Sequence, residues 1–373
     1  MATTYRYLFA DLLTNSIIAE LPLTGVSFTQ QLNQAGTFNA HLLLSGVNAE
    51  DLNVFNATIP GRNGVYVDRD GVLVWGGVVW GRNYSSSNQE LNITAREFES
   101  YFERRRITST TSFTNQDQLA VVRNLITQAQ SATNGNIGVL IGTETSGILV
   151  SRTYYSYEYK QVYQAIQDLA RSDDGFDFNI DVAYDGSGNP SKTLNLGYPR
   201  IGTVYSSTSL SAPVFNLPAG NIVEYEYPED GSAAANTVYA LGAGSNEGKL
   251  IATSQDATKI SSGWPLLEET TNYSDVTDST YLANLAVGQV SAISYPPTTI
   301  KAVVPASQQP VFGTYNLGDD ARLIITDSRF PAITTGVIPT AGLDAIYRIV
   351  GITVQPGENN PERVTLTLTT TTN

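Results

Sequence analysis

The chain contains no cysteine and only one histidine, His41, among its 373 residues. Without cysteine there is no disulfide framework, no thiolate nucleophile and no cysteine metal site. A single histidine excludes nearly all zinc chemistry, because zinc sites need several nitrogen or sulfur ligands, and it removes the serine–histidine–aspartate triad as a default hypothesis. We therefore predict no metal site and no cofactor.

Long apolar runs and basic residues are scarce as well. No stretch of about 18 or more apolar residues occurs, which predicts no membrane span, and the start "MATTYRYLFADLL" lacks the pattern of a secretory signal. The 21 Lys and Arg residues are outnumbered by 35 Asp and Glu residues, so the formal net charge is -14. This balance argues against a protein that grips nucleic acid, which needs a basic patch to neutralise phosphates.

Strand and turn signals dominate the first third of the chain. Apolar and polar residues alternate over 37–44, which predicts a strand with His41 on its wetter face. The tripeptide Arg69-Asp70-Gly71 predicts a tight hairpin, because glycine tolerates a positive φ. Short strands separated by such turns are typical of a small barrel or sandwich.

The middle third has a different pattern. Helical spacing of apolar residues begins after Asn115, which we predict as the N-cap, and a second amphipathic helix is predicted to end near Gly175. Strand, turn and strand follow, so this third is predicted to be α/β. Beyond about residue 222 strands return, interrupted by one helix at about 280–292.

Two hairpin-like segments, Gly76 to Thr94 and Val350 to Thr367, follow the same plan. Each has a glycine, a β-branched strand, a polar tip and a returning strand with alternating apolar residues. Each also closes one of the two β regions. The sequence therefore predicts a mainly β fold with an α/β insert, in which two related β-barrel domains flank an α/β domain and a helical excursion occurs.

No motif with the spacing of a catalytic or nucleotide site survives inspection. Gly242, Gly244 and Gly248 are spaced one residue too far apart for a dinucleotide fingerprint, and a strand follows where a helix is required, which favours a β-turn. The segment from Asp181 to Asn189 lacks the ligand spacing and closing glutamate of a calcium loop. We predict no catalytic residues and no enzymatic activity.

Two identical acidic residues are adjacent three times, and none of these pairs lies in a recognisable motif. Sequence adjacency does not imply the two carboxylates across a cleft that glycoside hydrolysis requires. The pairs are Asp173-Asp174, Glu268-Glu269 and Asp319-Asp320.

The basic run Arg104, Arg105 and Arg106 is unusual in so acidic a chain. One interpretation is a solvated strand or helix end whose long side chains cover neighbouring aromatic rings. A second is a phosphate site, which the acidic balance disfavours. The third is a contact with an acidic neighbouring domain or subunit, using the multi-donor guanidinium group.

Several segments, in the same order, resemble the tail-tip hub proteins of long non-contractile-tailed phages, especially the minor tail proteins of phages that infect actinobacteria. The hub fold of this family is shared with the baseplate hubs of contractile tails. The segments are "ELPLTGVSFTQQLNQAGTFNAHLLL", "VYVDRDGVLVWGGVVWG", "LNITAREFESYFERRRI", "ANTVYALGAG", "YNLGDDARLIIT" and "YRIVGITVQPG".

The resemblance implies a domain plan and an oligomer. The expected domains are a first β-barrel over 1–107, an α/β domain over 108–205, a discontinuous second β-barrel over 206–245 and 298–373, and a helix-containing insertion over 246–297. In such a homotrimer six barrels form a pseudo-sixfold ring that caps the tail tube. We predict that Arg104, Arg105 and Arg106 lie at a domain or subunit interface off the lumen.

The function implied by the resemblance is structural. The protein would belong to the virion, at the distal end of the phage tail. It would close the tail tube, adapt its sixfold symmetry to a threefold tip, contact the tape-measure protein, the distal tail protein ring and other tail-tip or receptor-binding proteins, and open for DNA ejection. DNA would pass through an acidic lumen without specific binding.

A rival hypothesis is a tail-associated protein that binds or hydrolyses glycans of the host cell wall. Exposed aromatic residues such as Trp75, Trp80 and Tyr84 would form a sugar platform. The chain ends at "TLTLTTTTN", whereas some members of the family continue into a lysin or receptor-binding region. Any such activity is therefore expected on another polypeptide.

Overall fold

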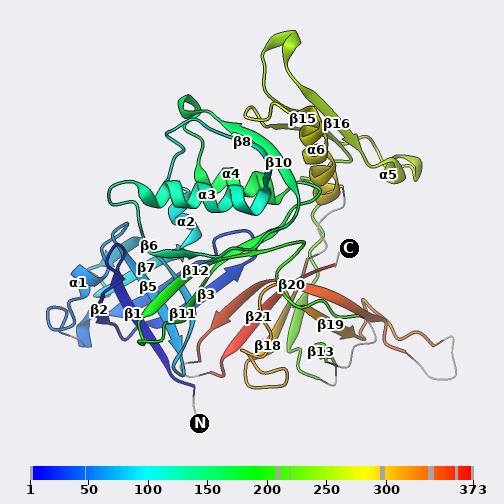
Figure 1. The fold of residues 1–373 in the computed structure, drawn as a ribbon. Coiled ribbons are helices and arrows are strands. Elements are labelled where there is room, and N and C mark those ends of the chain that lie inside the picture. The colour runs from blue at the N-terminus through cyan, green and yellow to red at the C-terminus, as the bar shows by residue number, and fades with distance from the viewer. Residues whose placement is uncertain are drawn as a thin grey trace.

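The computed structural model describes residues 3–46, 48–206, 211–218, 220–294, 299–334, 340–357 and 360–370. Most of this part of the chain is antiparallel β structure, and most of the helical residues lie above the sheet in the view of Figure 1. The mainly β fold with an α/β insert that the sequence predicts is confirmed. Residues 295–298, where the insertion was expected to end, and 371–373 lie outside the described residues.

Thirteen strands form one sheet, in the order β14-β18-β21-β20-β3-β4-β7-β6-β5-β1-β2, with β19 beside β20 and β13 beside β19. The strands of the first β region are β1 (Tyr5–Asp11), β2 (Ile17–Glu20), β3 (Thr24–Gln31), β4 (Thr37–Leu43), β5 (Asn63–Arg69), β6 (Val72–Ser85) and β7 (Glu90–Glu97). Those of the second β region are β13 (Val214–Leu217), β14 (Glu224–Glu226), β18 (Thr299–Pro305), β19 (Asp320–Ile325), β20 (Leu343–Gln355) and β21 (Arg363–Thr370).

Local sequence signals account for the strands and turns of the first region. Phe38, Ala40 and Leu42 of β4 are buried and the residues between and beyond them are not, as the alternation predicts. His41 is half-buried, with its Nδ1 3.0 Å from Glu90 Oε1. Asp70 and Gly71 join β5 to β6 with φ angles of 54° and 87°, which is the left-handed geometry of a tight hairpin. The predicted hairpin is confirmed.

One hydrophobic core runs under both β regions. In the first region Trp75 is fully buried, stacks on Phe38 at 5.3 Å between ring centroids, and donates its indole N–H to the carbonyl of Thr29 at 3.0 Å. The second region contributes aliphatic residues such as Leu323 and Ile349 to the same core. The two regions are therefore joined by packing as well as by the sheet.

The two regions repeat one strand plan. In chain order, β1, β3, β4, β5, β6 and β7 correspond to β13, β14, β18, β19, β20 and β21, and they pair in the same order: β3-β4-β7-β6-β5-β1 against β14-β18-β21-β20-β19-β13. One pairing departs from the repeat, because β1 is antiparallel to β5 whereas β13 is parallel to β19. The hairpins β6–β7 and β20–β21 contain the echo that the sequence predicts.

A second core holds the middle of the chain against the first region. Its elements are α2 (Glu99–Phe102), β8 (Thr111–Asp117), α3 (Gln118–Ser131), β9 (Val139–Ile141), β10 (Leu149–Tyr154), the 3-10 turn η2 (Ser156–Glu158), α4 (Val162–Ala170), β11 (Asp177–Tyr184) and β12 (Pro190–Gly197). Two smaller helical elements belong to the first region, η1 (Leu44–Gly46) and α1 (Val54–Ala57).

The predicted N-cap of α3 was wrong. Asn115 lies inside β8 with a φ of 47°, and its main-chain N–H donates to Ser151 Oγ. The cap is Asp117, whose carboxylate accepts the N–H groups of Leu119 at 2.9 Å and Ala120 at 3.2 Å. The strand pairing of β8 with β10 extends to Asp117 and so delays the start of the helix.

The remaining segment projects away from the main sheet (Figure 1). It contains β15 (Thr237–Leu241), η3 (Asn246–Gly248), β16 (Ile251–Gln255), α5 (Ala257–Ser261), β17 (Glu268–Asn272) and α6 (Ser279–Ile293), with the small sheet β16-β15-β17 against α6. Gly242 to Gly248 connect two antiparallel strands, as expected of a turn. β15 falls in the range 206–245 and pairs with strands of 246–297, and the domain limits given above stay a prediction.

Candidate assembly interfaces

The two β regions meet where β3 pairs with β20. Four residues of each strand are in antiparallel register, from Phe28 opposite Val354 to Gln31 opposite Gly351. The hydroxyls of Thr29 and Thr353 lie 2.9 Å apart across this joint. Main-chain pairing therefore makes one sheet of two regions that are more than 300 residues apart in sequence.

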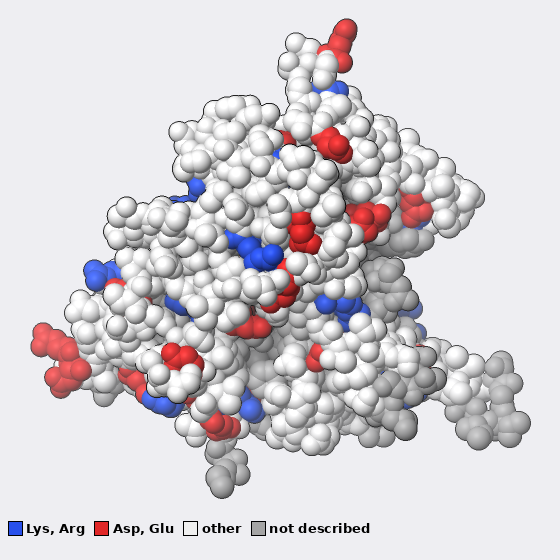
Figure 2. Space-filling model, in the orientation of Figure 1, with Lys and Arg blue, Asp and Glu red and all other residues white. Residues whose placement is uncertain are grey.

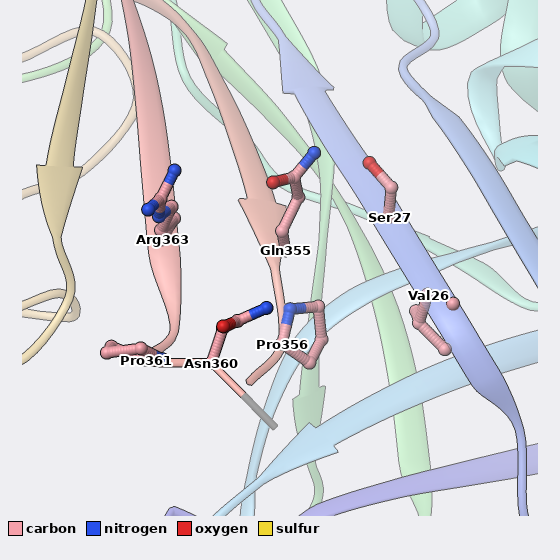
Figure 3. A pocket seen from close by; sticks show the side chains of 8 residues that line it. Val26, Ser27, Gln355, Pro356, Asn360, Pro361 and Arg363 are labelled. Atoms are coloured by element: carbon pink, nitrogen blue, oxygen red, sulfur yellow. The ribbon is translucent and has the colours of Figure 1, made fainter. Parts of the chain in front are cut away.

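A pocket lies at one end of this joint (Figure 3). Ser27 of β3 and Gln355 of β20 face it, and Arg363 of β21 lies beyond Gln355. Its described lining combines amide, hydroxyl and proline side chains with this one arginine. The pocket marks the seam between the two regions.

A mostly buried ion pair spans the same seam. Arg69, at the end of β5, donates from Nε and Nη2 to the two carboxylate oxygens of Glu362, at 2.8 Å each. The side chains are 16% and 10% exposed, and the hydroxyl of Tyr5 donates to the same carboxylate. Burial, and then the Glu362 carboxylate, raise the pKa of Tyr5 above its usual value. This cluster fastens the first strands to the last.

Two more arginines hold the middle of the chain to the second region. Arg348 of β20 contacts the carboxylate of Asp177 and donates to the carbonyl of Ile201 at 2.9 Å. Arg200 donates to Asp320 Oδ1 at 2.5 Å and to the carbonyl of Gly318 at 2.8 Å. Both guanidinium groups use their multiple donors to bind a carboxylate and a main-chain carbonyl together.

The projecting segment is attached through a fully buried pair. Arg152 Nη2 lies 3.0 Å from Asp275 Oδ2, and the two side chains are 0% and 1% exposed. Lys160 bridges Asp275 and Asp168 at 2.7 Å from each. Burial acts to raise the pKa of Asp275, but the charges of Arg152 and Lys160 outweigh it and hold that pKa below its usual value. The carboxylate therefore stays charged in the interior.

The predicted interface residues Arg104, Arg105 and Arg106 follow α2. Arg105 Nη2 donates to the carbonyl of Ala129 at 2.9 Å, near the C-terminus of α3, where a positive charge is favourable. Arg106 donates to the main-chain carbonyls of Glu103 and Arg105, at 2.7 and 3.1 Å, and Arg104 is exposed.

Across the described residues the triplet forms no ion pair with a carboxylate. The nearest acid in sequence, Glu103, is already bound in a two-point pair by Arg96 at 2.7 Å. A subunit interface at the triplet stays a prediction. Within the chain, the interdomain contacts described above are made by Arg69, Arg152, Arg200 and Arg348, which sequence reasoning missed.

Two buried glutamates, Glu97 and Glu99, precede the arginine triplet in the sequence. Glu97 accepts the N–H of Gly36 at 2.6 Å, and Glu99 accepts the N–H of Ile180. Burial is the largest cause of the raised pKa in both, and it brings the pKa of Glu99 to about 7. In the folded state, burial therefore favours the protonated, neutral form of both carboxyl groups.

The acidic pairs singled out in the sequence have structural partners or are exposed. Asp319 accepts the main-chain N–H groups of Thr203 and Asn316, at 2.7 and 2.8 Å, and Asp320 is bound by Arg200. Glu268 accepts the hydroxyl of Tyr239 at 2.6 Å. Asp173 and Asp174 are exposed just after α4.

The proposed sugar platform was wrong for one of its residues. Trp75 is fully buried in the core and cannot stack on a ligand. Trp80 is partly buried and donates its indole N–H to Ser100 Oγ at 2.7 Å, whereas Tyr84 is 49% exposed. The alternation of the strand places Trp75 inward, and burial removes it from the glycan-binding hypothesis.

Charged groups are spread thinly over the surface. On the face drawn in Figure 2, Lys and Arg occur singly or in small groups beside Asp and Glu, and most of the surface is neither. Among the residues that the structure describes, no group of three or more His, Cys, Asp or Glu residues could hold a metal ion. Nor does any described helix have the length and apolarity to cross a bilayer.

No family model and no curated protein matches the chain. Several solved structures are similar to it. A tail protein from Neisseria meningitidis MC58 is 12% identical, with a TM-score of 0.62 over 99% of this chain and 97% of that one. The 43 kDa tail protein of prophage MuSo2 from Shewanella oneidensis is 12% identical, with a TM-score of 0.58 over 98% of each chain.

The prophage tail protein gp18 from Listeria monocytogenes EGD-e is 13% identical, with a TM-score of 0.52 over 97% of this chain and 94% of that one. At such identities the likeness establishes the fold. The chain therefore has the fold of these phage tail proteins over nearly its whole described length. The narrower resemblance to hub proteins of actinobacteriophages stays a prediction.

Proposed function

We propose that the chain is a structural virion protein, the trimeric hub at the distal tip of a phage tail. The observation that carries the proposal is the repeated strand plan: one sheet contains two β regions with the same strand order. The likeness to phage tail proteins over nearly the whole chain supports a place in the tail.

Three copies of such a chain bring six similar β regions into one ring. A ring of this kind matches a sixfold tube on one side and a threefold tip on the other. Subunit contacts in a permanent ring bury on the order of 2,000 Å² or more each. The mostly buried pair of Arg69 and Glu362 keeps the two regions of one chain in a fixed relation, which a ring under mechanical load requires.

The partners of the ring follow from this position. They are the distal tail protein ring, the end of the tape-measure protein and other tail-tip or receptor-binding proteins. DNA leaves through the centre without specific binding, since the net charge of -14 repels a polyanion. The hub has no catalytic function, and Arg104 and Arg106, which are exposed, are the members of the basic triplet available to a neighbouring subunit.

Native mass spectrometry of the purified chain tests this proposal. We expect three-chain particles at micromolar concentration. A chain that is single both in solution and within particles would contradict it. Incubation of the same protein with host cell wall should release no reducing sugar, and release that disappears on a single Asp→Asn or Glu→Gln change would favour the glycan-hydrolysing alternative.

A further inference from the structure

The repeat of the strand plan extends to single residues of the two long hairpin strands. β6 pairs through its first half with β5 and through its second half with β7, and β20 pairs in the same way with β19 and β21. Both contain a bulge between the halves, after Val79 and after Ile349, and in both a glycine follows opposite a threonine: Gly81 opposite Thr94 and Gly351 opposite Thr367.

A second detail fixes the same alignment. The main-chain N–H of Gly61 donates to the carbonyl of Val79 at 2.7 Å, and that of Gly318 donates to the carbonyl of Ile349 at 2.7 Å. Both glycines have a positive φ, 73° and 92°. Gly81 is therefore equivalent to Gly351, and Tyr84 to Val354.

The second halves of β6 and β20 differ in what pairs with their outer edge. On β20, residues 351–354 pair with β3, which is the joint between the two regions. On β6, residues 81–84 pair with β7 on one side, and no described strand pairs with the other side. Arg82, Asn83 and Tyr84 are exposed. The first region thus has an open edge at the position where the second region is joined.

The strand that would complete this edge also has an equivalent. β14 corresponds to β3 and stands at the end of the sheet, paired only with β18 among the described strands. Ser27 lies opposite Asn39 as Glu226 lies opposite Lys301, so Phe28 to Gln31 of the joint correspond to Tyr227 to Asp230. This second edge is exposed at residues 228–230.

We propose that the internal joint is repeated between two copies of the chain: residues 81–84 of β6 pair antiparallel with residues 227–230 of a neighbouring copy. The register copied from the internal joint sets Gly81 opposite Asp230, Arg82 opposite Glu229, Asn83 opposite Pro228 and Tyr84 opposite Tyr227.

The side chains fit this register. Arg82 meets Glu229, an opposite-charge pair of the kind that stabilises directly opposed strand positions. Arg82 uses only Nη1 within its own chain, toward Phe55 and Thr58, and Glu229 lies 3.5 Å from Arg329 with both side chains more than half exposed. Tyr84 and Tyr227 would form a cross-strand aromatic pair, which is also favourable.

Proline fits the register as well. In the internal joint the N–H of Leu32 donates to the carbonyl of Val350, so residues 28, 30 and 32 direct their main-chain groups to β20 and Thr29 directs its own away. Pro228 is equivalent to Thr29. A residue without an N–H therefore falls where the joint needs no donor.

The joint is head-to-tail, since each copy uses a different edge on its two sides, so it closes into a ring or continues as an open chain of copies. Closure after three copies rests on the proposed function. The pairing of the two edges does not, and an experiment separates the two claims.

Engineered disulfides test the register, and the absence of native cysteine makes them specific. Asn83 and Pro228 form a non-hydrogen-bonded pair, with Cα atoms about 4.5 Å apart, which a disulfide spans. The double variant Asn83→Cys/Pro228→Cys should, on mild oxidation, move most of the protein to a covalent three-chain band. Asn83→Cys/Glu229→Cys is the matched control, because a shift of one residue turns the second thiol to the opposite face.

Each outcome decides one claim. A three-chain particle by native mass, with no disulfides formed in Asn83→Cys/Pro228→Cys, overturns the joint and leaves the proposed function standing. A ladder of two, three, four and more linked chains supports the joint and contradicts threefold closure. A chain that stays single contradicts both. Arg82→Glu should raise the concentration of half-dissociation roughly two- to fivefold, and adding Glu229→Arg should restore it.

Discussion

The two β regions follow one strand plan but differ in what covers them. The second region has a strand of the first along β20, and it carries the projecting segment between β14 and β18. The first region has no strand along the same half of β6 within the described residues, and its connection between β3 and β4 is short. In the joint proposed above, a neighbouring copy of the chain supplies the strand that this half of β6 lacks.

The cores of the two regions differ at individual equivalent positions. Trp75 in β6 is fully buried, and its equivalent in β20 is Ala345. Phe38 in β4 corresponds to Ile300 in β18, and both are fully buried. At these two positions the first region has the larger, aromatic side chain, while the second region buries aromatic residues at other positions, such as Phe215 and Tyr315. The repeat thus preserves the strand order and the bulges, while the size of the side chains at equivalent core positions changes.

The largest expected effect tests the difference in side-chain size between Trp75 and its equivalent, Ala345. Trp75→Ala should lower the free energy of unfolding by about 3–5 kcal/mol, because a large buried side chain leaves a cavity. The equivalent change in the second region, Ala345→Gly, should cost about 1 kcal/mol. Urea denaturation of both variants measures the difference. Equal losses of unfolding free energy in the two variants would mean that both positions contribute equally to the core, and would contradict the comparison.

The next effect concerns the seam itself. Glu362→Gln removes the charge that Arg69 binds and should cost about 3 kcal/mol, the lower end for a buried pair that loses one partner. The matched control is Asp344→Asn within the second region, whose pair with Arg322 is 34% and 40% exposed and should be worth less than about 1 kcal/mol. A control that costs as much as Glu362→Gln would contradict the special position of the seam.

A loss of stability as the pH rises from 5 to 8 is expected from the first region, which buries Glu97 and Glu99. Glu97 ends β7, and its equivalent at the end of β21 is Thr370. Because burial raises the pKa of Glu99 to about 7 in the folded state, from an ordinary value of 4.5, the favourable neutral form is lost as the pH rises through 7. The free energy of unfolding should fall by about 3 kcal/mol between pH 5 and pH 8.

Glu99→Gln keeps an oxygen that accepts the N–H of Ile180 and removes the titration. Its unfolding free energy should therefore change much less over the same pH range, as measured by urea denaturation at each pH. A variant with the same pH profile as the unchanged protein would assign the dependence to another group.

The smallest effect compares Gly61 and Gly318, the two glycines whose N–H groups donate to the carbonyls at the bulges. Gly61→Ala should cost about 1–2 kcal/mol, because its φ of 73° strains any residue with a Cβ and the nearest atom is 3.9 Å away. Gly318→Ala should cost more, since its Cβ would lie 2.5 Å from the carbonyl oxygen of Ile201. Thermal unfolding of the two variants gives the order, and the reverse order would contradict the close packing of the middle of the chain on the second region.

Local features of this fold could be predicted from sequence because they depend on neighbouring residues. The hairpin at Asp70 and Gly71 follows from backbone preferences, and the face of β4 follows from alternation. The N-cap of α3 could not be chosen correctly, because Asn115 and Asp117 are both good caps and the extent of β8 decides between them. That extent depends on its pairing with β10.

The assembly contacts were hidden for a related reason. Arg152 and Asp275 are more than 100 residues apart, and neither stands in a motif that names the other. The arginine triplet drew attention because its members are adjacent in sequence, yet the pairs that join domains are formed by isolated arginines. One signal was available: Gly81 and Gly351 follow β-branched or aromatic residues in similar hairpins, and they mark the bulges that align the two regions.

The central claim is that copies of this chain join through equivalent edges into a ring of similar β regions. Electron-microscopy class averages of the purified, unmodified protein test it most directly. The account predicts a closed ring with six similar lobes around a central opening, formed by three chains. A compact twofold dimer, or solitary chains at the concentrations where native mass is measured, would contradict it.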